Sequence, residues 1–299
     1  MDNHHHPGAG AGAGAGTHAA AGHSVGEPDY AALADLLDLD AEVLHSYLSE
    51  VTAWVHDLAA GRPVGRILDL GSGTGTGAFA LAGRFPGAEV IAVDRSAEFL
   101  ARLAGHAGQR GLTGRVRTVQ ADLDAAWPAI GPADLVWASN SVHHTADPDR
   151  VLAKVFGALR PGGGLALAEM GALPRFLPDD IGLGEPGLEA RCHAALAEAM
   201  ATEVPHLGDD WAARLVKAGF TIEAERTFAI DLTPPLPAAT ARYVQATLSR
   251  MRSGLDGQMS PGDLATLDAL VDGDGPASVL RRDDLTVRGA RTVWMARRG

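Results

Sequence analysis

Glycines and an aspartate gather where a short apolar segment ends. Residues 67–77 read Ile-Leu-Asp-Leu-Gly-Ser-Gly-Thr-Gly-Thr-Gly, which predicts a strand that runs into a glycine-rich turn and then a helix. Gly71 and Gly73 let the backbone turn tightly and approach a ligand where a Cβ atom would collide. Asp69 would repel a pyrophosphate but suits a cationic group. The turn therefore indicates a ligand that carries positive charge.

A second aspartate, Asp94, ends the next apolar segment, 21 residues after Gly73. This placement suits a pair of hydrogen bonds to the hydroxyls of a ribose. NAD-binding folds share it, so the turn and Asp94 alone leave the cofactor open.

Two adjacent histidines, His143 and His144, follow the fourth predicted strand. Open α/β sheets bind ligands at the carboxyl ends of their strands, and an imidazole can take a proton from a hydroxyl or amine near neutral pH. Either histidine is therefore a candidate general base, with a slight preference for His143. The alternative is that the pair only shapes the loop or caps the helix expected near Pro148.

Strands and helices alternate through the segment that carries these residues. The apolar runs predict strands at 66–70, 89–93, 116–119, 134–138 and 165–169, and helical patterns lie at 75–84, 97–110 and 149–159. This alternation predicts a mostly parallel sheet with helices on both faces.

The motifs and their order resemble the class I S-adenosylmethionine-dependent methyltransferases. Residues 69–75 resemble motif I of that family, Asp94 its ribose-binding acid, residues 120–123 its third-strand segment, and residues 160–164 its turn before the fifth strand. The similarity covers roughly residues 62–170. It implies a Rossmann-like α/β fold, with a seven-stranded, mostly parallel sheet whose last strand is antiparallel and with helices on both faces.

The resemblance implies S-adenosylmethionine as the cofactor. By analogy, Asp69 with the backbone of the turn would hold the methionine portion and Asp94 the ribose. Asp122 with Leu123 would flank the adenine, and Asn140 would lie near the methyl group. The full set of cofactor-binding candidates is Asp69, Gly71, Ser72, Gly73, Asp94, Arg95, Asp122, Leu123 and Asn140. A His-His pair often follows the fourth strand in the subgroup of small-molecule enzymes that includes ubiquinone and menaquinone methyltransferases, so His143 and His144 are the catalytic candidates.

The remaining segments are additions to this core. Residues 1–26 hold three adjacent histidines, His4 to His6, and a Gly-Ala repeat, and we expect a disordered tail. Residues 27–61 predict a helical lid, and residues 62–299 the cofactor-binding domain with helical insertions at 171–208 and 233–284. Candidates for lining an acceptor pocket in these additions are Tyr47, Trp54, Phe176, His193 and Tyr243.

Composition excludes several classes of partner. The formal net charge of −12 repels phosphate backbones, so we expect no nucleic acid partner. The single cysteine, Cys192, allows neither an intrachain disulfide nor a thiolate metal cluster. No run approaches the roughly 18 apolar residues of a bilayer span, so we expect a cytoplasmic protein with no membrane contact. Since the fourth-strand loop has no aspartate before Asp147, we expect no metal.

The leading hypothesis is methyl transfer to an oxygen, nitrogen or carbon of a small-molecule acceptor. Secondary metabolism is a candidate context for the reaction, and a homodimer is a candidate oligomeric state. An alternative is a protein of the same fold that binds S-adenosylmethionine without methylating, such as a cyclase or a binding component. A third reading is an NAD-dependent oxidoreductase. Asp69 and the turn at Pro161-Gly162-Gly163 argue against it.

Overall fold

One sheet organises the part of the chain that the computed structural model describes, residues 29–299. Its seven strands lie in the order β3-β2-β1-β4-β5-β7-β6. The tail expected at residues 1–26 lies outside the described residues. The strands are β1 (Arg66–Leu70), β2 (Glu89–Asp94), β3 (Val116–Gln120), β4 (Ala133–Ser139), β5 (Leu159–Met170), β6 (Thr221–Leu232) and β7 (Val287–Arg297).

The direction of the strands confirms the predicted fold class. Strands β1 to β5 pair in parallel, and β7, the last strand in the sequence, runs antiparallel to both β5 and β6. Parallel neighbours need crossover connections, which the helices provide. The strand ranges agree with the apolar runs to within a few residues, except that β5 begins before residues 160–164. That glycine-rich segment is an irregularity in the β4–β5 pairing, between the pairs Ala133–Leu159 and Leu135–Gly164.

Helices cover both faces of the sheet. The helices are α1 (Tyr30–Val43), α2 (His45–Ala59), α3 (Thr76–Arg84), α4 (Ala97–Gln109), α5 (Pro148–Ala158), α6 (Leu188–Glu203), α7 (Trp211–Lys217), α8 (Thr240–Ser253) and α9 (Pro261–Val271), with short 3-10 turns η1 (Val142–His144) and η2 (Val279–Arg281). Successive residues of β1 belong to the two layers, since Ile67 lies in the apolar cluster that includes residues of α2, α3 and α4, and Leu68 lies in the one that includes residues of α5 and α7.

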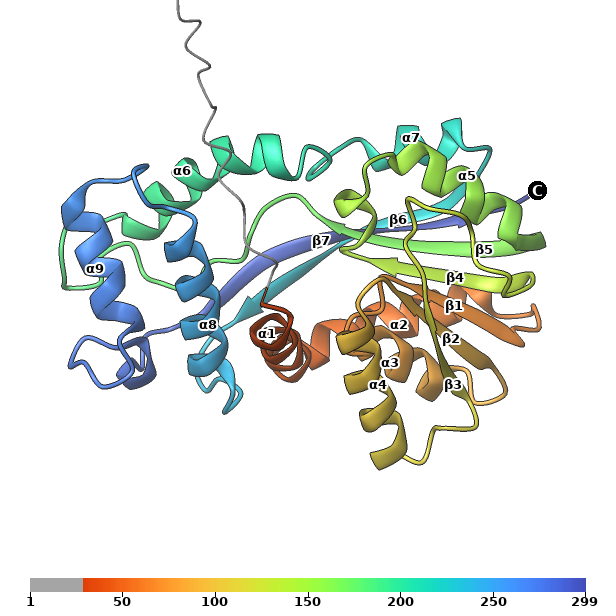
Figure 1. The fold of residues 1–299 in the computed structure, drawn as a ribbon, viewed down its shortest axis with the longest axis horizontal. Helices are drawn as coiled ribbons and strands as arrows, with labels where there is room; N and C mark the ends of the chain where they lie inside the picture. The colour runs from red at the N-terminus through yellow and green to blue at the C-terminus, as the bar shows by residue number, and fades with distance from the viewer. Residues whose placement is uncertain (1–28) are drawn as a thin grey trace, which may run out of the picture.

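The segment before the first strand forms two helices rather than one continuous helix. The sequence pattern at 27–60 marks an apolar stripe but contains no breaker, and the chain turns at Leu44, which is buried with Val43. Helix α1 contacts both α4 and α8. In Figure 1, the ribbons of β6 and β7 extend from the sheet toward α6, α8 and α9, and α1 lies between α8 and the sheet.

Among residues 29–299, every helix is too short or too polar to cross a bilayer.

Candidate functional site

Five neighbouring strands each deliver a candidate residue to the same edge of the sheet. Strands β3, β2, β1, β4 and β5 are adjacent and parallel, so their carboxyl ends lie together. The residues at or just after those ends are Asp122, Asp94, Gly71, Asn140 and Glu169. The structure thus brings together four predicted candidates that are up to about 70 residues apart in the sequence, and it adds Glu169 to them.

The glycine-rich turn follows β1 and is tightly enclosed. Gly71 and Gly73 adopt positive φ angles of 66° and 52°, which glycine accommodates without strain. A Cβ atom on Gly71 would lie 2.3 Å from the Cβ atom of Ser141, and one on Gly73 would lie 3.1 Å from Cδ1 of Leu37. The turn therefore passes directly against the loop after β4 on one side and against α1 on the other.

Asp94 holds the glycine-rich turn in place. One carboxylate oxygen accepts the backbone N–H of Gly73 at 2.9 Å, and the other accepts that of Ser96, also at 2.9 Å. Each oxygen has a second lone pair, so the half-buried carboxylate can accept further hydrogen bonds from a ligand. Arg95, the next residue, is exposed.

Asp69 lies beneath the turn rather than at its surface. The residue is only 2% exposed, and its Oδ2 atom has no hydrogen-bond partner within the described residues. Burial raises the pKa of this carboxyl to about 7, the negative charge of Asp94 adds to the rise, and the backbone N–H of Ala78 opposes it. Asp69 therefore loses its proton much less readily than an exposed aspartate does.

Polar atoms of the turn and of the β4 loop are also enclosed without partners. Within residues 29–299, the buried hydroxyl of Ser72 and the Oδ1 atom of Asn140 make no hydrogen bond. Asn140 has a φ angle of 49°, a left-handed conformation that asparagine tolerates better than most residues. The hydroxyl of Ser141 donates to the carbonyl of Leu70 at 2.8 Å and so joins the loop to β1.

The two loop residues after β3 differ in exposure. Asp122 is exposed and accepts the backbone N–H of Asp124 at 2.8 Å, whereas Leu123 is half-buried. The carbonyl of Leu123 accepts Nζ of Lys154 at 2.9 Å, which fixes the loop against α5.

His143 forms a buried pair with a glutamate that the sequence analysis did not assign. Its Nδ1 atom contacts the carboxylate of Glu169, whose other oxygen accepts the backbone N–H of Val142 at 3.1 Å. The side chains are 5% and 1% exposed. Glu169 is the acidic end of an otherwise apolar strand, and that position was the only signal available in the sequence.

His144 lies beside His143 but in a different electrostatic environment. The two ring centroids are 4.1 Å apart. Partial desolvation lowers the pKa of His144 to about 4, and the positive charges of His143, Arg95 and Arg250 contribute to the decrease. His144 is therefore neutral at pH 7 and holds a proton weakly.

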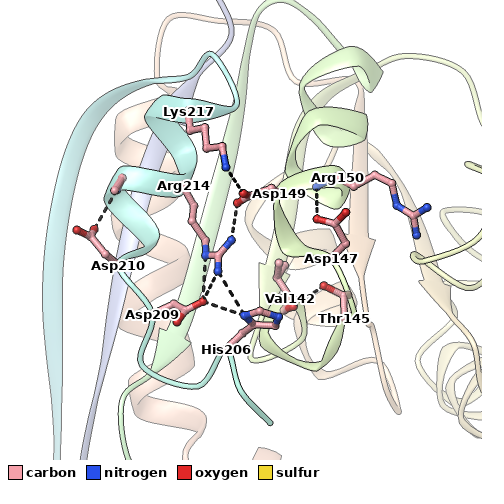
Figure 2. A network of polar contacts seen from close by, with 11 residues as sticks. Val142, Thr145, Asp147, Asp149, Arg150, His206, Asp209, Asp210, Arg214 and Lys217 are labelled. Carbon is pink, nitrogen blue, oxygen red and sulfur yellow. Dashed lines mark hydrogen bonds and ion pairs between the residues drawn. The ribbon is translucent and has the colours of Figure 1, made fainter. Parts of the chain in front are cut away.

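A network of charged side chains fixes the helix that follows the two histidines. Figure 2 shows Arg214 of α7 between Asp209 and Asp149, with distances of 2.6 and 2.5 Å. Lys217 and Arg214 hold the pKa of Asp149 below its usual value. His206 completes the network at 3.0 Å from Asp209. Since Asp149 lies in the first turn of α5, the network ties this helix and the preceding η1 turn to α7.

A hollow of about 730 Å³ lies away from this edge, between α1, α2, α3 and α4. Its lining includes Asp38, His45, Phe79 and His106, and it meets the glycine-rich turn only at Thr74. It contains none of the residues that the strands deliver to the carboxyl edge.

Comparison with known proteins supports the family resemblance. Residues 67–163 match the family model of a methyltransferase domain. Demethylmenaquinone methyltransferase from Thermus thermophilus is 37% identical over 119 residues, which is 40% of this chain and 53% of that protein. Trans-aconitate 2-methyltransferase from Deinococcus radiodurans is 36% identical over 126 residues, which is 41% of this chain and 46% of that protein. The chain thus spans about half the length of these relatives.

The fold comparison extends over more of the chain. A crystal structure from Bacillus halodurans C-125, provisionally described as a methyltransferase, has a TM-score of 0.52 and 19% identity, and the match covers 83% of this chain and 98% of that one. The shared fold therefore includes elements on both sides of the region that the family model matches.

Proposed function

We propose that this chain, whose residues 67–163 match the family model of a methyltransferase domain, transfers a methyl group from S-adenosylmethionine to a small-molecule acceptor. The observation that carries the proposal is the convergence of five strand ends on a tight glycine-rich turn that Asp94 fixes through the N–H of Gly73. His143 and Glu169 lie at the carboxyl ends of β4 and β5, at one end of this series of strand ends.

The side chains at this edge fit the cofactor. Asp69, Ser72 and Asn140 each have a buried polar side-chain atom with no hydrogen-bond partner in the described residues. Burial of such an atom costs free energy unless a ligand forms the missing hydrogen bond. Asp69, Ser72 and the backbone of Gly71 and Gly73 would hold the amino acid portion.

The remaining candidates would hold the nucleoside. Asp94 keeps lone pairs for the two ribose hydroxyls, and Asp122 with Leu123 would flank the adenine. Arg95 adjoins the ribose site, and Asn140 would lie near the sulfur. This order along the edge follows the order of strands β1, β2 and β3, with β4 beside β1.

When bound, S-adenosylmethionine would supply an electrophilic methyl carbon on a cationic sulfur. An electron pair of the acceptor would bond to this carbon as the carbon–sulfur bond breaks. The protein's first contribution is to hold the acceptor atom in line at roughly 3 Å from that carbon, since positioning alone supplies much of the acceleration.

His143 is the general base in this proposal. A carboxylate on Nδ1 fixes the tautomer in which Nε2 is unprotonated, and it stabilises the positive ring once Nε2 has taken a proton. The proton that the acceptor loses would therefore move to Nε2 of His143, and Glu169 would remain a carboxylate. His144 is poorly suited to the same task, because a group with a pKa of about 4 retains a proton weakly.

Calorimetric titration with S-adenosylmethionine and S-adenosylhomocysteine tests the proposal. We expect saturable binding of both ligands at one site per chain, together with an increase in melting temperature. Asp94→Asn is the matched variant, because it keeps the shape of the side chain and removes its charge. Absence of binding to a folded sample would eliminate the proposed function.

A further inference from the structure

A second group of polar side chains lies beside the proposed base and has no part in the assignments above. It consists of Asp40 on α1, Tyr47 on α2, Tyr243 on α8 and Arg291 on β7. The Tyr243 hydroxyl donates to Oδ1 of Asp40 at 2.9 Å, and Nη2 of Arg291 lies 3.4 Å from the same oxygen. The group joins four elements, of which three are helices outside the region that the family model matches.

The guanidinium of Arg291 is enclosed but weakly bonded. The side chain is 12% exposed, and its carbon lies 5.0 Å from the ring centroid of Tyr47. Burial acts to lower its pKa, but Asp40 and the two tyrosine hydroxyls reverse the effect and keep it charged. A guanidinium has five N–H donors, and the long bond to Asp40 together with the interaction with the hydroxyl oxygen of Tyr47 engages only part of them. Most of its donor capacity is therefore available to a ligand.

Tyr47 provides a separate sign of a ligand. The residue is 7% exposed, and its enclosed hydroxyl faces the guanidinium of Arg291 with its oxygen but donates its O–H to no acceptor in the described residues. Burial raises the pKa of this hydroxyl, so it remains a neutral donor at physiological pH. An enclosed donor beside an under-bonded guanidinium suits a group that can accept several hydrogen bonds at once.

The register of the sheet places Arg291 beside the strand end that carries Glu169. Arg291 is directly opposite Met170 on β5, and Met170 follows Glu169. Partners of this kind have Cα atoms about 5 Å apart. Glu169 is also close enough to Tyr47 to contribute to its raised pKa. Successive side chains of β5 point to opposite faces, so a small molecule bound by Arg291 would have to pass the carboxyl end of β5 to bring its other end near His143.

The surroundings of His144 add positive charge on the same side. Arg95 and Arg250 both act on His144, and within the described residues neither makes an ion pair with an acid. Arg250 is seven residues after Tyr243 on α8, which places it on the same helix face about 10 Å further along. Although the chain as a whole carries a charge of −12, cationic groups gather here. Such a local excess favours an anion, because long-range repulsion is screened beyond about 8 Å.

We propose that the methyl acceptor is a small organic acid, and that Arg291 binds its carboxylate with help from the hydroxyl of Tyr47. The inference deepens the proposed function and rests on it. Arg291 would donate hydrogen bonds to the carboxylate that lies away from the atom receiving the methyl group. Arg250, which is exposed, would add positive charge near the acid but would not enclose its carboxylate as Arg291 would.

The first experiment compares acids with their neutral esters. The protein is incubated with labelled S-adenosylmethionine and one acid, which is 4-hydroxybenzoate, malonate or tricarballylate. Parallel reactions use the methyl ester of each acid with all its carboxyl groups esterified. We expect saturable label transfer to at least one acid and little transfer to its ester. Transfer to esters alone, or to none of the acids, would overturn the inference. If S-adenosylhomocysteine still binds, the proposed function survives that result, whereas failure of cofactor binding removes both.

The second experiment uses Arg291→Gln, with Arg242→Gln as the matched control because Arg242 is an exposed neighbour of Tyr243. For the acid that is methylated, we expect KM to rise roughly 10- to 100-fold in R291Q, since a hydrogen bond to a charged group is lost. Titration of the S-adenosylhomocysteine complex with that acid should show the same loss, while affinity for S-adenosylhomocysteine and all constants of R242Q stay unchanged.

A double variant separates ligand binding from a purely structural ion pair. If Arg291 serves only to neutralise Asp40, then D40N/R291Q should recover both the melting temperature and the KM of the unmodified protein. Our inference predicts recovery of the melting temperature without recovery of KM. An unchanged KM in R291Q, or full recovery in the double variant, would overturn it.

Discussion

The Nδ1 atom of His143 contacts a carboxylate that is almost completely enclosed, that of Glu169. The two residues come from different strand ends, β4 and β5, and Glu169 is also bonded to the backbone of the η1 turn. A carboxylate that binds both the ring and the backbone beside it fixes the orientation of the ring. This pair gives the proposed mechanism its most specific consequence.

Glu169→Gln should lower kcat by about 10²- to 10⁴-fold. The glutamine can still accept the N–H of Val142, but its amide would donate to Nδ1 of His143, which moves the ring proton to Nε2. The base would then be blocked with little change of shape. Steady-state kinetics with an identified acceptor checks this expectation, together with calorimetry for S-adenosylhomocysteine, whose affinity should not change.

His144→Gln is the control for that experiment. Since His144 holds a proton weakly, we expect kcat to change by less than about tenfold. A larger loss of kcat in H144Q than in E169Q would show that His144, and not His143, is the base.

Asp94→Ala should weaken S-adenosylhomocysteine binding by about 1 to 3 kcal/mol, because it removes the ribose contacts and the anchor of Gly73. Asp94→Asn, which retains one accepting oxygen, should lose less. Calorimetry at one pH measures both variants. Equal affinity in D94A and in the unmodified protein would remove Asp94 from the site.

The raised pKa of Asp69 predicts pH-dependent cofactor binding. A carboxyl with a pKa of about 7 must lose its proton to stabilise the ammonium group of the cofactor, so affinity should rise with pH. If only the ionised form binds, affinity increases about tenfold between pH 6 and pH 8. Calorimetry across that range tests the sign. Asp69→Asn should bind weakly and independently of pH, and a flat profile in the unmodified protein would argue against the contact.

Gly71→Ala should destabilise the fold by more than about 2 kcal/mol. The left-handed conformation disfavours alanine, and the new Cβ atom would collide with Ser141. Gly105→Ala, in the middle of α4 with no atom within 4 Å of the new Cβ, should instead stabilise by roughly 0.5 to 1 kcal/mol. Urea denaturation measures both changes. Similar stability of the two variants would mean that the turn is not tightly enclosed.

Local patterns were sufficient to predict most elements, because apolar runs and caps act over a few residues. Helix α4, for example, begins where Ser96 accepts the N–H of Phe99, and its range agrees with the sequence pattern to within one residue. The break at Leu44 was missed because it depends on packing against the body of the protein. No glycine or proline marks it in the sequence.

The candidate site was only partly predictable, for a related reason. Asp94, Gly71 and Asn140 follow strands in a recurring order, so their position at one edge could be inferred from the topology. The pairing of His143 with Glu169 and of Arg291 with Asp40 joins residues that are 26 and 251 positions apart. Nothing local specifies such pairs, and Arg291 looks from the sequence like any polar residue of a half-exposed strand.

The place of β7 in the sheet has a consequence for synthesis of the protein. Strand β6 leaves the ribosome before β7, yet within residues 29–299 β7 is its only partner in the sheet. Until β7 emerges, both edges of β6 are unpaired while β1 to β5 can already associate. The composition of β6 reduces the risk of aggregation, because most of its residues stay at least partly exposed and only Phe228 and Ile230 become buried. The β6 segment can therefore remain solvated while the rest of the chain is synthesised, and the sheet is completed when β7 inserts between β5 and β6.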